Sequence, residues 1–201
     1  MSKKVLRIVS SPRGEASISI KLGNAIVEKI KAKYTDSIVT VRDLTTDFPH
    51  FEEPQTTSIF IAKENRTPEQ AEAVKLSDEL IEELHGSDIV VIDAPLYNLF
   101  VPSTLKAYID HIVRAKETFR YNEDGTIEGL VKNKKVYVAY ASGAVFSEDG
   151  AVFDDFVSPY LTQILGFIGI TDIKFFRAEG VAIPGIQETA LQKGIGSIVI
   201  D

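Results

Sequence analysis

The chain has 201 residues, of which 44% are hydrophobic and 25% are charged. That length suits one domain with a substantial core, and the balance is typical of a soluble globular protein. Lys and Arg number 22 against 29 Asp and Glu, a formal net charge of −7, so no overall positive field favours nucleic acid. The chain has no cysteine, which excludes disulfides, thiol redox chemistry and thiolate metal sites. Any redox activity therefore requires a cofactor.

The first nine residues are basic, and their apolar run is too short and too charged for a signal peptide or a membrane span. We therefore expect a cytoplasmic protein with no membrane partner.

Hydrophobic periodicity predicts five strands alternating with five helices. In chain order these are strand Val5–Val9, helix Ser17–Lys33, strand Ser37–Leu44, helix Thr67–Leu84, strand Asp88–Ala94, helix Ser103–Arg114, strand Lys135–Ala141, helix Phe153–Leu165, strand Asp172–Ala178 and helix Gln187–Ile200. This alternation predicts a single α/β domain over residues 1–201, with a doubly wound parallel sheet and helices on both faces.

Local signals refine this pattern. Thr67-Pro68 followed by Gln70 is typical of a helix start with a capping box, and Gly86 is a stop signal. The segment 45–66 has no sustained period and is predicted to be a long loop or short irregular pieces. Residues 119–127 are predicted to form a small hairpin outside the main alternation.

The loop after the first strand carries hydroxyl groups just before a helix. Ser10, Ser11, Ser17 and Ser19 would lie beside free helix N–H groups and the positive end of the helix dipole, an arrangement that suits a phosphate monoester. The loop is neither a P-loop nor a G-x-G-x-x-G turn. Simple N-capping by Ser17 is the structural alternative.

The loop after the third predicted strand is the most informative segment. The run 89–92 is apolar at every position, as in a central parallel strand, so its carboxyl end faces a crevice. Tyr97 offers a flat ring and Asn98 an amide that donates and accepts, while nearby backbone N–H groups can bond the edge of a planar heterocycle. An ordinary strand-to-helix loop is the alternative.

The histidines predict no metal site, because His50, His85 and His111 are scattered along the chain and form no H-x-x-x-H or H-E-x-x-H motif.

Four segments together resemble the FMN-dependent NADH-azoreductase family, which is flavodoxin-like: Ser17–Ser19, Ala94–Lys106, Thr118–Tyr121 and Leu165–Asp172. The resemblance covers nearly the whole chain and rests on the order and spacing of these segments. It implies the strand order 2-1-3-4-5, a tightly bound FMN, NADH or NADPH as electron donor, and reduction of quinones and azo compounds on the flavin without an essential catalytic side chain.

The resemblance also implies the residues of the site. The cofactor-binding residues it implies are Ser10, Ser11, Ser17, Ile18, Ser19, Pro95, Leu96, Tyr97, Asn98, Leu99, Ala141, Ser142, Gly143 and Ala144. Many relatives carry Ser-Arg-Gly-Gly at the last of these loops, and the arginine is absent here. Phe146 would border the substrate space. Asn98, Tyr121 and Phe167 are expected pocket residues, the last two in a homodimer whose aromatics cover the partner's flavin.

Two rival functions stay open at this point. One is a non-catalytic flavodoxin-type electron carrier, which is normally shorter and strongly acidic. The other is a nucleotide-binding regulatory module with no redox role.

Overall fold

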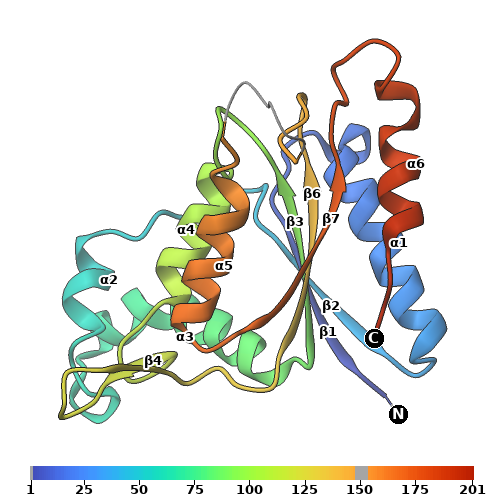
Figure 1. Ribbon diagram of the computed structural model, residues 1–201. Helices are drawn as coiled ribbons and strands as arrows, with labels where there is room; N and C mark the ends of the chain where they lie inside the picture. Colours follow the sequence, from blue (N-terminus) through green and yellow to red (C-terminus); the bar gives the residue numbers. More distant parts are fainter. Residues whose placement is uncertain (1, 148–153) are drawn as a thin grey trace.

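A five-stranded parallel sheet forms the centre of the protein, as a computed structural model covering residues 2–147 and 154–201 shows (Figure 1). Its strands are β1 Lys4–Val9, β2 Ile38–Asp43, β3 Ile89–Pro95, β6 Lys135–Ala141 and β7 Asp172–Ala178. They lie in the order β2-β1-β3-β6-β7. Strands β4 and β5 form a separate two-stranded sheet, so β6 and β7 are the fourth and fifth strands of the main sheet. The predicted doubly wound sheet and its order 2-1-3-4-5 are therefore confirmed.

Helices cover both faces of the sheet. They are α1 Ile18–Lys33, α2 Glu53–Ser58, α3 Pro68–Gly86, α4 Ser103–Ile112, α5 Val157–Phe167 and α6 Gln187–Ser197. Helices α1 and α6 lie on one face, and α3, α4 and α5 on the other (Figure 1). Each face has its own apolar cluster, with Leu6 and Ile8 pointing to the α3 side and Val5 and Val91 to the α1 side.

Strand β3 is the centre of this arrangement, because it pairs with β1 on one side and β6 on the other. All seven of its residues are buried, as the continuous apolar run predicts. Strand β2 is an edge strand and leaves Ile38 63% exposed. Because β3 lies at the centre of the sheet, the chain that follows Pro95 emerges at the carboxyl ends of the strands, between the loops of its neighbours. Ligands bind at this edge in doubly wound folds.

The capping box at the start of α3 is present as predicted. Thr67 Oγ1 accepts the N–H of Gln70 at 3.3 Å, and Gln70 Oε1 accepts the N–H of Thr67 at 3.0 Å. Gly86 is the last residue of the helix.

The structure differs from the sequence prediction in the segment 45–66 and at the ends of several elements, helices α5 and α6 among them. Helix α2 and a 3₁₀ turn at Lys63–Asn65 lie inside the segment 45–66, where no helix was predicted. Six residues are too few to show a helical period. Helix α5 begins at Val157, and the predicted start at Phe153 lies outside the described residues; α6 ends at Ser197 instead of Ile200.

The predicted hairpin is present as β4 Phe119–Tyr121 and β5 Ile127–Gly129. It packs closely on its own chain, because a Cβ at Gly129 would lie 2.2 Å from the backbone nitrogen of Gly169. The glycine at 129 therefore permits a backbone contact that no other residue allows.

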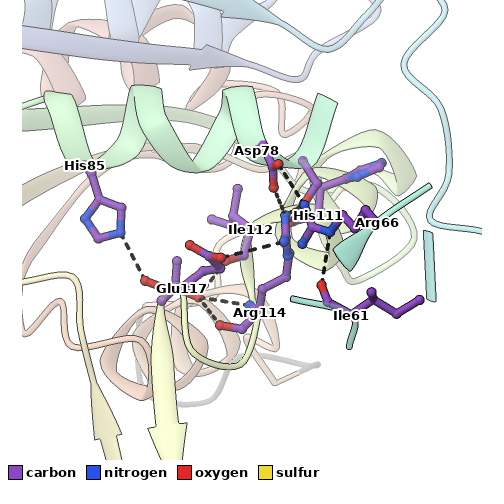
Figure 2. A network of polar contacts seen from close by, with 10 residues as sticks. Ile61, Arg66, Asp78, His85, His111, Ile112, Arg114 and Glu117 are labelled. Atoms are coloured by element: carbon purple, nitrogen blue, oxygen red, sulfur yellow. Dashed lines mark hydrogen bonds and ion pairs between the residues drawn. The ribbon is translucent and has the colours of Figure 1, made fainter. Parts of the chain in front are cut away.

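A polar cluster anchors the hairpin and the segment before α3 to the helices (Figure 2). The buried guanidinium of Arg114 contacts Asp78 Oδ1 at 2.5 Å and Ser77 Oγ at 2.9 Å. Arg66 reaches the other oxygen of Asp78 at 3.2 Å and the carbonyl of Ile61 at 3.1 Å. One carboxylate thus links the 61–66 segment, α3 and the chain that leads into β4.

Candidate functional site

Three loops converge at the carboxyl edge of the sheet, at the upper side of Figure 1. They follow β1, β3 and β6, which are adjacent strands. The backbone joins two of them directly, since the N–H of Leu96 donates to the carbonyl of Ala141 at 2.8 Å. The three segments predicted from the sequence as one site therefore lie together in space.

The first loop ends in a cluster of hydroxyls at the start of α1. Ser17 Oγ accepts the N–H of Ile20 at 3.3 Å and lies 3.0 Å from Ser19 Oγ, and both serines are buried. The N–H groups of Ile18 and Ser19 open the helix and have no intrahelical acceptor. Two hydroxyls, two free N–H groups and the positive end of the helix dipole form a donor set that fits a phosphate dianion.

Ser10 and Ser11 have different contacts. The hydroxyl of Ser10 donates to the carbonyl of Asp93 at 2.6 Å, so it ties the loop to β3. Ser11 Oγ lies 3.5 Å from the phenol oxygen of Tyr97, at the outer limit of a hydrogen bond. The side chain of Arg13 is exposed. The hydroxyls of this loop that lie beside the first N–H groups of α1 are therefore those of Ser17 and Ser19.

The loop after β3 contains a strained turn. Tyr97 and Phe100 exchange backbone hydrogen bonds of 2.9 and 3.0 Å across Asn98 and Leu99, whose φ angles are +50° and +66°. Asparagine tolerates the left-handed region, but a leucine there is a conformational outlier. Such strain persists where a surrounding structure or a ligand site requires it.

A groove of about 610 Å³ opens beside this turn. Its lining residues come from the first loop, the segment after β2, the turn and the start of α4: Ser10, Pro12, Thr45, Tyr97, Asn98, Phe100, Val101, Pro102, Ser103, Thr104 and Lys106. Its volume lies in the range of small-molecule and cofactor sites. Of these residues, the sequence prediction gives Ser10, Tyr97 and Asn98 as site residues and misses the others. The signal for most of the missed ones was the segment Ala94–Lys106, on which the family resemblance rests.

The third loop is held by polar contacts within the chain. Ser142 Oγ donates to the carbonyl of Ala144 at 2.8 Å. Glu179 accepts the N–H of Phe146 at 3.1 Å and the hydroxyl of Ser147. A Cβ at Gly143 would meet only the Cβ of Ala182, at 3.5 Å, so the chain itself does not require glycine at this position.

Arg177 on β7 does not take the place of the arginine absent from this loop, because other groups already hold its guanidinium. The guanidinium of Arg177 on β7 lies 4.5 Å above the ring of Tyr140. It is paired with Asp155 at 2.9 Å and with Glu179 at 3.4 Å. These carboxylates neutralise Arg177, which leaves backbone groups and Ser142 as the polar groups this loop can offer.

Tyr121 and Phe167 lie far from the three loops of their own chain. The ring of Phe119 contacts both, with centroids 5.6 Å from Tyr121 and 4.6 Å from Phe167. The hairpin that carries Tyr121 lies toward the opposite, lower end of the sheet in Figure 1. Of the three expected pocket residues, Asn98 therefore lines the groove of its own chain, and Tyr121 and Phe167 do not.

An ion pair beneath the first loop was not predicted from the sequence. Arg7 on β1 contacts Asp93 on β3 at 2.8 Å, and the carboxylate is fully buried. Burial raises the pKa of Asp93 to about 7, while the charge and hydrogen bonds of Arg7 lower it. The available signal was an acidic residue directly after the apolar run 89–92.

Comparison with known proteins identifies the family. A family model described as flavodoxin-like fold matches residues 3–198. A protein of Herminiimonas arsenicoxydans named FMN-dependent NADH:quinone oxidoreductase is 45% identical over 181 residues, which cover 90% of this chain and 88% of the relative. A protein of the same name from Mesorhizobium japonicum is 40% identical and covers 96% of this chain and 93% of its own length.

The chain belongs to the family of FMN-dependent NADH:quinone oxidoreductases.

Solved structures in this family agree in fold. An azoreductase from Bacillus anthracis superimposes with a TM-score of 0.87 at 30% identity, covering 96% of this chain and 95% of its own. An FMN-dependent NADH-azoreductase from the same species, in complex with FMN, gives a TM-score of 0.84 at 27% identity, covering 96% of this chain and 94% of that one.

Residues 2–147 and 154–201 contain neither a membrane-spanning helix nor a metal-binding cluster. None of the helices in this part of the chain combines the length and apolarity needed to cross a bilayer. The same residues contain no group of three or more His, Asp or Glu side chains placed to hold a metal ion.

Proposed function

We propose that this protein is an FMN-dependent enzyme that oxidises NADH and reduces quinones and azo compounds. The observation that carries the proposal is the convergence of the three loops, with the strained turn at Asn98 and Leu99, in a chain of this family. When bound, FMN supplies the redox chemistry, taking a hydride from the nicotinamide and passing two electrons to the acceptor. The relatives are named as oxidoreductases for NADH, which favours catalysis over an electron-carrier role and NADH over NADPH.

The residues present fit FMN. The phosphate would be held by the hydroxyls of Ser17 and Ser19 and by the first N–H groups of α1. The isoalloxazine edge would be bonded by the backbone N–H groups of Asn98 and Leu99, since those of Leu96 and Tyr97 already donate to Ala141 and Phe100. The amide of Asn98 is exposed and free to turn toward the same edge. Backbone groups of residues 141–144 would bond the remaining part of the isoalloxazine edge. The role of the protein is to bind and orient the ring.

We further propose that the active form is a homodimer. Tyr121 is 67% exposed and Ile127 is 47% exposed on a hairpin that is firmly anchored to its own chain. Such apolar exposure on a rigid element is typical of an interaction surface. Since Tyr121 and Phe167 lie away from their own groove, they can cover a flavin only in the partner. The proposed location of this dimer is the cytoplasm, with small-molecule quinones or azo compounds as acceptors.

We expect the three loops and the partner's aromatic side chains to leave one stacking surface on the flavin, so that NADH and the acceptor bind in turn. The test begins with a visible spectrum of the purified protein, which we expect to show bound flavin that NADH bleaches in the absence of oxygen. Steady-state assays with NADH and a quinone should then give parallel double-reciprocal lines, and planar aromatics should compete with NADH. A colourless protein that does not bind added FMN would disprove the function, and intersecting lines with a trappable ternary complex would disprove the single site.

A further inference from the structure

The buried ion pair between Arg7 and Asp93 joins two strands to the helix that opens the proposed phosphate site. Arg7 Nη2 and Nε lie 2.8 and 3.1 Å from the same oxygen of Asp93. The guanidinium also donates to the carbonyl of Ile20 at 2.9 Å and to Asn24 Oδ1 at 2.5 Å. Both acceptors belong to the first two turns of α1.

The same pair sets the height of α1 above the sheet. A Cβ at Gly23 would lie 1.8 Å from Asp93 Oδ1, so α1 packs directly on the carboxylate. Among the described residues, Oδ1 has no hydrogen-bond partner. Any larger residue at 23 would force the helix away from β3, and the first turn of α1 would move with it.

Asp93 also holds the start of the first loop, since its carbonyl accepts the hydroxyl of Ser10 at 2.6 Å. The contacts of Arg7 and Asp93 therefore fix the loop at both ends: at Ser10, where it leaves β1, and at Ile20, one residue beyond Ser19. Ile20 is also the residue whose N–H bonds to Ser17 Oγ.

Stability alone gives a poor reason for such a pair. The desolvation cost of two buried charges often cancels their attraction, and apolar residues of similar volume are frequently as stable. An apolar pair would, however, lack the directed hydrogen bonds to Ile20 and Asn24 that fix the start of α1 against the sheet.

We propose that Arg7 and Asp93 are positioning residues for the FMN phosphate, which hold the first turn of α1 in register with the ends of β1 and β3. This inference rests on the proposed phosphate site at Ser17 and Ser19. It concerns the geometry of the site, because neither side chain is placed to touch the ligand: both lie between the sheet and α1.

The test compares binding of FMN with binding of riboflavin, which has the same ring but no phosphate. Both dissociation constants are measured by fluorescence titration of apoprotein for the wild type and Arg7→Met. Arg42→Met is the matched control, because Arg42 pairs with Glu83 at 2.5 Å between β2 and α3, on the other side of the sheet. We expect Arg7→Met to weaken FMN binding about tenfold, to change riboflavin binding by less than about twofold, and Arg42→Met to change neither.

Each other outcome is decisive. Equal weakening of FMN and riboflavin, or no change in either, overturns the positioning role. If Arg7→Met does not fold, the double variant Arg7→Met with Asp93→Asn, which leaves no unpaired carboxylate, is titrated in its place and judged by the same ratio. If the wild type itself binds FMN and riboflavin equally, the proposed phosphate site fails, and this result is distinct from failure of the positioning role.

Discussion

The phenol oxygen of Tyr97 lies 3.5 Å from Oγ of Ser11, so the loop after β3 touches the loop after β1 through their side chains. The two loops are also joined below this contact, where Ser10 donates to the carbonyl of Asp93. A ligand that spans both loops would therefore meet a surface that is assembled before it binds. Preorganisation of this kind lowers the entropic cost of binding.

The first prediction concerns the phosphate site. Replacing Ser17 and Ser19 together by Ala should weaken FMN binding by at least about tenfold, because each charge-assisted hydrogen bond contributes about 1.5–3 kcal/mol. Fluorescence titration gives the dissociation constant. Loss of the Ser17 cap should also lower the free energy of unfolding by about 1 kcal/mol.

Ser37→Ala is the control for this change, since Ser37 Oγ bonds the carbonyl of Tyr34 just beyond the other end of α1. Riboflavin affinity should stay the same in both variants. Unchanged FMN affinity in the double variant would show that the phosphate binds elsewhere.

The second prediction concerns the strained turn. Leu99→Val should lower the free energy of unfolding by about 1 kcal/mol more than Leu96→Val, because a β-branched residue tolerates positive φ least. Both leucines are half-buried in the same loop and lose the same methylene, so the difference isolates the backbone term. Chemical denaturation measures it, and equal losses would mean that the turn relaxes without strain.

Most of the fold could be predicted from the sequence because its signals are local. The apolar run 89–92 and the capping box at Thr67 depend on neighbouring residues only, and both are present. Helix α2 was missed because it is short, although Glu52 and Gln55 form a capping box at its start. The Arg7–Asp93 pair was missed because its partners are 86 residues apart, and only the register of β1 against β3 brings them together.

The third prediction follows from the pKa of Asp93. Burial raises this pKa from 3.8 to about 7, against the lowering effect of Arg7. Between these two pH values the folded protein binds a proton that the unfolded chain releases. The contribution of Asp93 protonation to the free energy of unfolding is therefore present in full below pH 3.8 and is lost as the pH rises through about 7. Relative to Asp93→Asn, which does not titrate at this site, the wild type should lose stability from pH 4 to pH 7. Denaturation of both proteins across this range measures the difference; a difference independent of pH would place the pKa of Asp93 in the ordinary range.

The last prediction tests the homodimer through its hairpin. Ile127→Glu places a charge on a rigid, exposed apolar surface, and desolvating that charge in an interface should dissociate the dimer. Val199→Glu is the matched control, because Val199 is also an exposed aliphatic residue, 63% accessible, but lies near the end of the chain beyond α6. Light scattering should give a dimer for the wild type and the control and a monomer for Ile127→Glu. The monomer should also lose most quinone reductase activity, since Tyr121 and Phe167 would no longer cover the partner's flavin. A wild-type monomer with full activity would contradict a pocket completed by the partner.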